Sequence, residues 1–281
     1  MRSRVLFIAI IAVGALLVSW PFISNWQFTK QADELLAAYD SRVQAMPEQQ
    51  RSDELERARA YNDNLSGLVV EDPFVAGSGI AYPTGYDNVL NTDGNGLMGH
   101  LEIPALSLSL PIYHGADDAV LEKGVGHIAT TALPVGGAGT HCVLAAHRGL
   151  PGKELFTNVD KLVAGDVFLL RVLGETFAYR IDQISVVEPE ALVDILPEPG
   201  ADLCTLVTCT PLNINSHRLV IRGVRTEYIE GAPLPASPNN GARRALSAYE
   251  KQLLLALCIG VAAIAAALLV TRAALRRRQH P

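Results

Sequence analysis

The chain has 281 residues, of which 49% are hydrophobic, and its 29 acidic and 23 basic side chains give a formal net charge of −6. This length accommodates one domain of ordinary size plus appendages. All 29 acidic side chains but only 17 basic ones lie between two uncharged apolar runs at residues 5–23 and 253–270, so this middle part has a net charge of −12. Such an acidic balance argues against a nucleic-acid partner.

The two apolar runs are predicted to be transmembrane helices. They are 19 and 18 residues long, close to the roughly 20 residues that a helix needs to cross a bilayer. Arginines in residues 1–4 precede the first run, and four arginines in residues 271–281 follow the second. The positive-inside rule therefore places both termini in the cytoplasm and the middle outside. A cleaved signal peptide is the alternative for the first run, but bulky Trp20 and Phe22 stand where cleavage needs small residues, which favours an uncleaved anchor.

Residues 24–65 are predicted to form a helical arm. Apolar residues recur at helical spacing in 29–46 and again in 48–65, with Pro47 between them. The pattern fits equally well an arm packed against another part of the protein and a bare two-helix stalk. Residues 66–96 follow with many Gly, Pro, Asn and Tyr residues, and a loop of this length is usually a functional cover or a disordered segment.

Residues 97–230 have the pattern of a β domain. Short apolar runs separated by turn residues predict strands at 97–103, 108–113, 142–146, 167–173, 176–187, 204–208 and 219–225. A hairpin turn is expected at 173–176 and one short helix at 155–162. Seven or eight short strands in about 130 residues indicate a closed β-barrel or a sandwich. Residues 231–252 are interpreted as a linker.

Three residues with catalytic chemistry are predicted at strand ends. Cys209 closes the strand before Pro211, Arg218 opens the next strand, and His147 follows the strand at 142–146. Thiol acyl transfer needs a thiolate nucleophile, a proton donor for the leaving amine and a donor for the oxyanion. An imidazolium and a guanidinium nearby are expected to favour the thiolate. The alternative interpretation is that Cys209 is a small buried core residue and Arg218 a solvated arginine at a strand edge. Five other histidines compete for the role of base: His100, His114, His127, His141 and His217.

The spacing of these residues resembles the sortase signature over roughly residues 97–228. Thr-Leu-Val-Thr-Cys209 is followed nine residues later by Arg218, and His147-Arg148-Gly149 lies upstream. The surrounding sequence, the arm, the two apolar runs and Asp72-Pro73-Phe74 resemble the class C, pilin-polymerising branch. The resemblance implies a closed eight-stranded sortase-type β-barrel with an N-terminal helical arm and two transmembrane helices, on the surface of a Gram-positive cell.

The resemblance also implies a reaction and its partners. Cys209 attacks the Thr–Gly bond of a Leu-Pro-x-Thr-Gly sorting signal, His147 protonates the leaving amine and Arg218 binds the oxyanion. A lysine of another pilin subunit then resolves the thioester into an isopeptide bond. No metal or organic cofactor is implied. Alternatives are a cell-wall-anchoring sortase that uses a peptidoglycan amine, a hydrolase that uses water, and a non-catalytic surface protein anchored at both ends.

In class C sortases an Asp-Pro-aromatic motif forms a lid over the active site. In this sequence the motif is Asp72-Pro73-Phe74. The resemblance implies that Asp72 faces Arg218 and that Phe74 covers the thiol of Cys209. The alternative interpretation is that Asp72-Pro73 is ordinary turn chemistry.

Two further features remain outside this scheme. Cys142 and Cys204 each lie five residues before a catalytic candidate, and could meet if their strands are neighbours. Because a cross-strand disulfide is geometrically demanding, two buried free thiols are the favoured expectation, while Cys258 lies inside the second apolar run. Residues 234–238, Leu-Pro-Ala-Ser-Pro, mimic a sorting signal but lack its glycine and are interpreted as linker.

Overall fold

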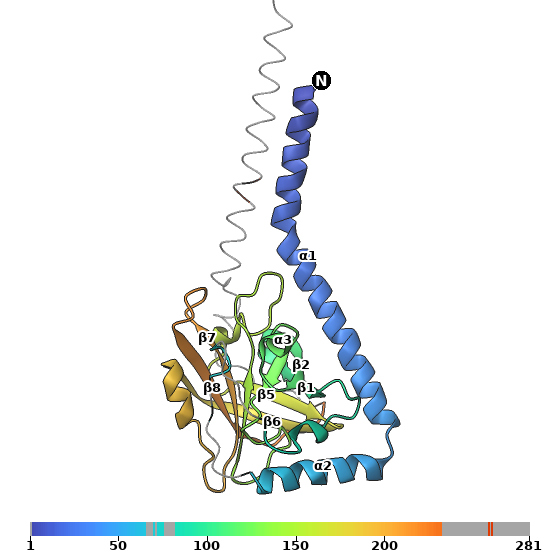
Figure 1. Ribbon diagram of the computed structural model, residues 1–281, viewed down its shortest axis with the longest axis vertical. Helices are drawn as coiled ribbons and strands as arrows, with labels where there is room; N and C mark the ends of the chain where they lie inside the picture. Colours follow the sequence, from blue (N-terminus) through green and yellow to red (C-terminus); the bar gives the residue numbers. More distant parts are fainter. Residues whose placement is uncertain are drawn as a thin grey trace, which may run out of the picture. The chain divides into compact units, whose positions relative to one another are not determined.

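The computed structural model describes residues 2–65, 70, 72–75, 82–231, 258 and 260 (Figure 1). These residues fall into two compact units. Residues 2–28 and 151–153 belong to the smaller unit, and the larger unit contains the described residues from 29 to 150 and from 154 to 231. The larger unit holds the barrel and the candidate site.

Two helices precede the barrel. Helix α1 is continuous from Arg2–Ala45, and α2 covers Glu48–Asp63, so the predicted arm helices are present and the first begins much earlier than residue 29. Pro47 separates them because a proline has no N–H to continue a helix. From residue 29 onward both helices bury one face, formed by Ala32, Leu36, Tyr39 and Val43 on α1 and by Glu54, Leu55, Ala58 and Asn62 on α2.

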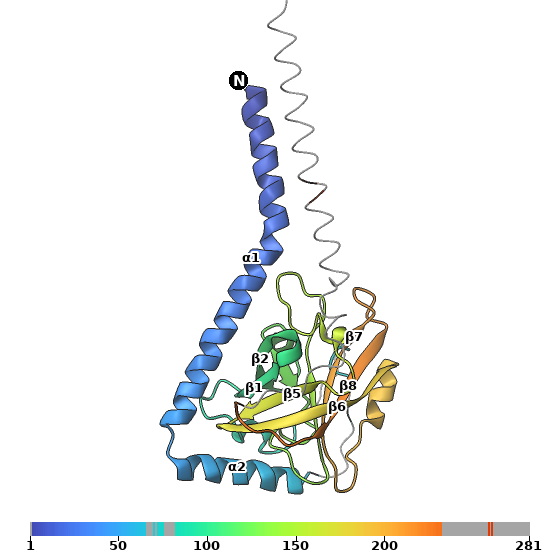
Figure 2. The ribbon, with the colours of Figure 1, turned by 180° about the vertical axis from the view of Figure 1, so that it is seen from behind.

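The arm is fixed to the barrel through buried hydrogen bonds. The hydroxyl of Tyr39 donates to the carbonyl of Met98 and accepts from the N–H of Leu173, both at 2.9 Å. The side chain of Asn62 accepts from the N–H of Leu133 at 2.7 Å and donates to its carbonyl at 3.2 Å. These bonds distinguish a packed arm from a bare stalk, and Figure 2 shows α2 lying beside the strands.

Eight strands form a closed barrel in the order β1-β2-β3-β4-β7-β8-β6-β5. Their bounds are β1 Leu97–Ile103, β2 Leu108–His114, β3 Val125–His127, β4 Thr140–Ala145, β5 Val167–Val172, β6 Glu175–Val187, β7 Asp202–Thr210 and β8 His217–Arg225. The β2–β3 and β4–β7 pairs are parallel and the others antiparallel. The prediction of a closed eight-stranded barrel is thus confirmed.

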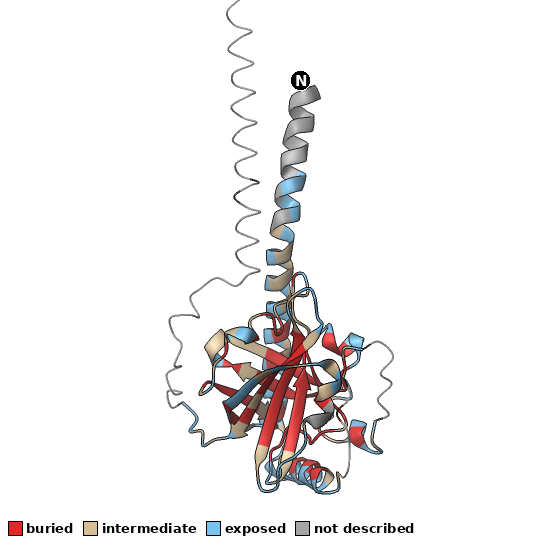
Figure 3. Cartoon of the chain, turned by 90° about the vertical axis from the view of Figure 1, so that its left-hand side faces the viewer, coloured by how far each residue is buried: buried red, intermediate tan, exposed pale blue. Residues whose placement is uncertain are grey.

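Strands β4 and β7 are buried on both faces, as Figure 3 shows for the centre of the barrel. Val143, Ala145 and Val207 belong to an apolar cluster on one face. Because side chains alternate between the two faces of a strand, Cys142 and Cys204 point to the opposite face. The odd-numbered residues of both strands therefore lie on the face that includes Cys209.

Two local predictions differ from the structure. Strand β3 was not predicted, since it has only three residues and a central glycine, too short for a periodic pattern. The helix expected at 155–162 is wrong: turns lead into a short 3-10 helix, η3, at Val159–Lys161. Leu155 has a φ of 39°, a left-handed conformation that an α-helix cannot contain. The remaining short helices are η1 Tyr86–Asn88, η2 Pro104–Leu106, α3 Asp118–Leu121 and η4 Pro189–Asp194.

The membrane part of the prediction is unconfirmed. Among the residues that the structure describes, no helix combines the length and the apolar character that crossing a bilayer requires. The second expected span, residues 253–270, lies outside the described residues except for 258 and 260. The expected linker beyond residue 231 and the tail at 271–281 also lie outside them.

Candidate active site

Cys209 and Arg218 face each other across neighbouring strands. Cys209 is the penultimate residue of β7, and its register partner on antiparallel β8 is Arg218. Pro211 cannot donate to the ladder and so ends β7. Asn213 and Asn215, with φ of 67° and 60°, turn the chain back into β8, a conformation that asparagine tolerates well. The local sequence therefore fixes the thiol beside the guanidinium.

His147 reaches the same end of the barrel from β4. This strand runs parallel to β7 and pairs Ala145 with Val207. The pairing continues one residue further, because the N–H of Ala146 donates to the carbonyl of Val207 at 3.3 Å and Thr208 Oγ1 donates to the carbonyl of Ala146 at 2.7 Å. The next residues in this register are His147 and Cys209. All three predicted residues thus come together at the ends of adjacent strands.

The five competing histidines have other partners. Their ring nitrogens lie within 3.3 Å of the following groups: His100 of Glu102, His114 of the Gly96 and Val89 carbonyls, His127 of the Tyr86 hydroxyl and the Ala132 carbonyl, His141 of the Leu196 carbonyl and the Thr205 hydroxyl, and His217 of Glu188. His147 is favoured because the register of β4 and β7 places it next to Cys209.

Arg218 is held by two backbone carbonyls and one carboxylate. Its side chain is only 5% exposed. Nη1 donates to the carbonyls of Asn215 and His217, both at 2.9 Å. Nε donates to both carboxylate oxygens of Asp72 at 3.0 Å, and Nη2 donates to Oδ2 at 2.6 Å. A planar guanidinium is well suited to such two-point recognition of a carboxylate.

Asp72, Pro73 and Phe74 lie over these residues and are called the Asp72–Phe74 segment below. Asp72 Oδ1 also accepts from the N–H of Phe74 at 3.1 Å, so the segment has both a turn and a long-range ion pair. The ring of Phe74 lies 5.7 Å from the His147 ring between centroids, and the Cζ of Arg218 lies 5.3 Å from the Phe74 centroid. The segment thus contacts two of the three candidates and, together with its neighbours, leaves Cys209 only 6% exposed.

Burial raises the pKa of the Cys209 thiol to about 11, and the charge of Asp72 adds to this effect while Arg218 opposes it. The thiol is therefore protonated at neutral pH in this conformation. The Arg218 charge lowers the pKa of Cys209, as expected from the sequence, but burial of the thiol outweighs it. The thiolate expected from the cationic neighbours is therefore not the form favoured in this conformation. The ion pair with Asp72 raises the pKa of Arg218 although burial lowers it.

Arg148, part of the His147-Arg148-Gly149 motif, has a structural role that the sequence did not predict. Its side chain is 8% exposed. Nε donates to the carbonyl of Thr157 at 3.2 Å, Nη1 donates to Thr210 Oγ1 at 3.1 Å, and Nη2 pairs with Asp160 at 2.6 Å. It therefore ties the loop after His147 to the residue next to Cys209. In the sequence it could be taken for a solvated arginine at a strand end.

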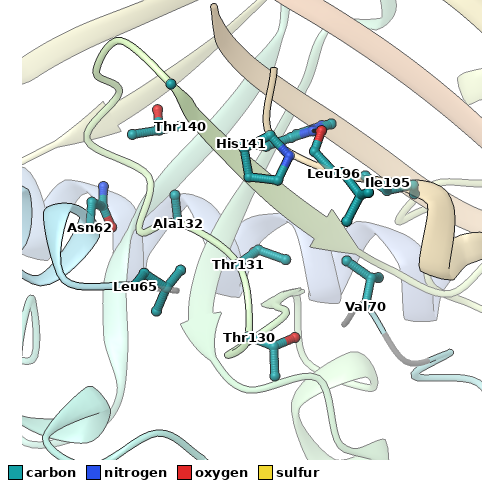
Figure 4. Close-up of a pocket in the computed structure, with 12 residues that line it drawn as sticks. Asn62, Leu65, Val70, Thr130, Thr131, Ala132, Thr140, His141, Ile195 and Leu196 are labelled. Atoms are coloured by element: carbon teal, nitrogen blue, oxygen red, sulfur yellow. Dashed lines mark hydrogen bonds between the residues drawn. The ribbon is translucent and has the colours of Figure 1, made fainter. Parts of the chain in front are cut away.

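A pocket of about 140 Å³ lies near the apolar cluster and is lined by Val70, Thr131, His141 and Ile195 among others (Figure 4). Val70 belongs to the same cluster as Val143 and Val207, and Phe74 packs against it. Val70 and Phe74 therefore cover part of the apolar face on which Cys209 lies. Within the described part of the chain, no group of three or more His, Cys, Asp or Glu side chains is arranged to hold a metal ion.

Comparisons with known proteins agree with this architecture. Residues 101–226 match the sortase domain family. The structure is similar to sortase C of Streptococcus pneumoniae, with 40% identity and a TM-score of 0.65, covering 71% of this chain and 99% of that one. It is also similar to sortase C-1 of Actinomyces oris, with 40% identity, a TM-score of 0.59 and coverage of 63% and 99%. Sortase A of Bacillus anthracis is 25% identical over 216 residues, 77% of this chain and 90% of that protein. The chain therefore belongs to the sortase family of cysteine transpeptidases.

Proposed function

We propose that this protein is a class C sortase that joins pilin subunits through isopeptide bonds. The observation that carries the proposal is the Asp72–Phe74 segment, whose carboxylate binds Arg218 at two points above Cys209. A lid of this kind is what the resemblance to class C sortases predicts. The similarity to S. pneumoniae sortase C, an enzyme studied for its pilin substrate specificity, supports the same assignment.

The proposed reaction begins at the thiol of Cys209. Its proton passes to His147 as the sulfur attacks the threonine carbonyl of a Leu-Pro-x-Thr-Gly signal. Arg218 donates hydrogen bonds to the developing oxyanion. The carbon–nitrogen bond to glycine then breaks, and the imidazolium of His147 gives its proton to the leaving amine. A thioester remains on Cys209.

The second half-reaction transfers the acyl group to the next subunit. The side-chain amine of a pilin lysine attacks the thioester carbonyl, and His147 accepts the proton that this amine loses. The carbon–sulfur bond breaks, the thiolate of Cys209 leaves, and an isopeptide bond joins the two subunits. Water in place of the lysine gives hydrolysis, and a peptidoglycan amine gives attachment to the cell wall.

The Asp72–Phe74 segment is proposed to be a lid that must move before catalysis. In the closed arrangement Asp72 occupies donors of Arg218, and Phe74 lies against His147. Closure also keeps the pKa of Cys209 at about 11. The covered site is thereby kept as a neutral thiol, which reacts slowly with electrophiles and oxidants.

We further propose that residues 5–23 and 253–270 anchor the protein in the cell membrane, with both termini cytoplasmic and the barrel outside. The support is the length of the two apolar runs and the arginines beside them. Protease treatment of intact and of opened cells tests this topology. Cleavage of the barrel only after the membrane is opened would contradict it.

The transpeptidase proposal is tested with a purified pilin subunit that carries a sorting signal and an acceptor lysine. The parent chain should give covalent ladders on a denaturing gel, while Cys209→Ala should give none. Cys204→Ala, which removes a thiol on the same strand, is the matched control and should keep activity. Ladders that persist in Cys209→Ala would overturn the proposal, and products formed only with a peptidoglycan amine would reassign the acceptor.

A further inference from the structure

We propose that Cys142 and Cys204 form an oxidation site, a thiol pair that a peroxide converts into a disulfide between β4 and β7. The two residues are register partners in the parallel ladder of these strands. Both are free thiols in the structure and both are buried. The proposed transpeptidase reaction uses neither of them.

The backbone geometry allows the bond. Paired residues on neighbouring strands have Cα atoms about 4.8 Å apart, within the 4.4–6.8 Å that disulfides span. Because the partners are directly opposite, their side chains point to the same face of the barrel wall. Closing the pair requires the two sulfurs to approach to bonding distance, without a change of strand register.

The surroundings make the two thiols unequal. Burial alone raises the pKa of Cys142, but the neighbouring Cys204 and His127 outweigh it and lower the pKa to about 6. Burial and the neighbouring Cys142 instead raise the pKa of Cys204. The His127 ring is itself fixed, with Nδ1 2.7 Å from the Tyr86 hydroxyl and Nε2 2.8 Å from the Ala132 carbonyl. In the proposed reaction Cys142 is the attacking thiolate and Cys204 is the thiol that resolves it.

The reaction balances with hydrogen peroxide as the oxidant. The Cys142 thiolate attacks one peroxide oxygen and the O–O bond breaks, leaving a sulfenic acid on Cys142 and releasing hydroxide. The Cys204 sulfur then attacks the sulfenic sulfur, and its proton leaves with the departing hydroxyl group as water. Two thiols lose two electrons, and one peroxide becomes two waters. Peroxide is close to water in size, so local opening of the barrel suffices to admit it.

Cys209 is not part of this pair. It lies five residues beyond Cys204 on β7, roughly 17 Å along a strand, and its side chain points to the other face. Its pKa of about 11 makes it a poorer peroxide target than Cys142 while the Asp72–Phe74 segment is closed. Oxidation is therefore expected first at Cys142 and Cys204, and Cys209 is expected to remain a thiol.

The test uses the full chain carrying Cys209→Ala, so its outcome does not depend on the transpeptidase proposal. The protein is treated with hydrogen peroxide at neutral pH, unfolded in an alkylating agent and digested with trypsin without reduction. A cross-linked species should join peptide 124–148 to peptide 181–218, with a mass two hydrogens below the sum of the two thiol peptides. Reduction should separate it. Most of the pair should convert before any sulfinic acid accumulates.

A second variant serves as the matched control. Cys209→Ala with Cys204→Ser keeps the Cys142 thiol without its partner, and should give a dimedone-trapped sulfenic acid on Cys142 and no cross-link. The proposal is overturned if Cys209→Ala shows only over-oxidised Cys142, or if both thiols remain alkylatable under treatment that oxidises the unfolded chain. The cross-link in Cys209→Ala decides the matter even if the serine variant fails to fold.

Discussion

The Asp72–Arg218 ion pair should suppress the reactivity of Cys209, and Asp72→Asn tests this directly. The substitution keeps the size of the side chain but removes the charge that raises the pKa of the thiol and that holds the segment to Arg218. With the segment released, water reaches Cys209 and burial, the largest cause of the raised pKa, is relieved. The pKa should therefore fall from about 11 toward the ordinary value of 9.0.

The size of the effect follows from this shift. A fall of about two pKa units raises the thiolate fraction near neutral pH roughly 100-fold, since each unit is a factor of ten. A thiolate of lower pKa is intrinsically less nucleophilic, with a Brønsted coefficient of about 0.4–0.5. Over two units this costs a factor of roughly 6–10. The net alkylation rate of Cys209 should therefore rise about tenfold.

The assay is the rate of iodoacetamide labelling at Cys209 as a function of pH, read by peptide mass spectrometry. Asp182→Asn is the matched control, because Asp182 also pairs with an arginine at 2.6 Å but does not affect the Cys209 thiol. The control should label as the parent does, with a midpoint near 11. If Asp72→Asn also keeps the parental rate and midpoint, the segment does not govern the thiol and the proposed lid fails.

Three further substitutions separate the roles of neighbouring residues. Arg218→Lys loses the two-point contact with Asp72 and the planar donor set. The transpeptidation rate should therefore fall about 10²-fold or more, while the labelling rate of Cys209 rises. A fall in both rates would contradict this prediction. Arg148→Ala removes charge-assisted bonds to the loop after His147 and should lower the free energy of unfolding by about 1.5–3 kcal/mol, measured by urea titration, with Arg148→Lys closer to the parent. Tyr39→Phe leaves two buried backbone groups without their hydroxyl partner and should cost about 1–3 kcal/mol. An unchanged unfolding curve would mean that the Tyr39 hydroxyl adds nothing to the stability of the protein.

How far the sequence predicts the fold depends on the length of each element. Strand β1 was predicted at its observed bounds, because seven residues between turn-forming segments give a clear pattern. Strand β3 was missed because three residues give none, although it closes the barrel between β2 and β4. The prediction of a helix at 155–162 was wrong because Leu155 has a positive φ. The spacing of apolar residues in this segment contains no information about that angle.

The candidate site was predicted better than its chemistry. Cys209, His147 and Arg218 are predicted to lie together because each stands at a strand end, and the register of β4, β7 and β8 brings these strand ends side by side. Their catalytic roles stay a prediction. The lowering effect of Arg218 on the Cys209 pKa is as expected, but the net rise comes from burial and from a carboxylate 146 residues away from Arg218 in the chain. A local sequence pattern contains no information about such long-range burial and charge effects on a pKa.

The hydrogen bonds of Arg218 explain why opening is obligatory in the proposed mechanism. A guanidinium has five N–H donors, and the two of Nη1 are used by backbone carbonyls that position the group. Asp72 occupies the Nε donor and one of the two on Nη2. A substrate oxyanion needs the same donors, so Asp72 and the transition state compete for Arg218. Any event that displaces Asp72 therefore acts twice, because it frees the oxyanion donors and removes a charge that adds to the effect of burial on the pKa of Cys209.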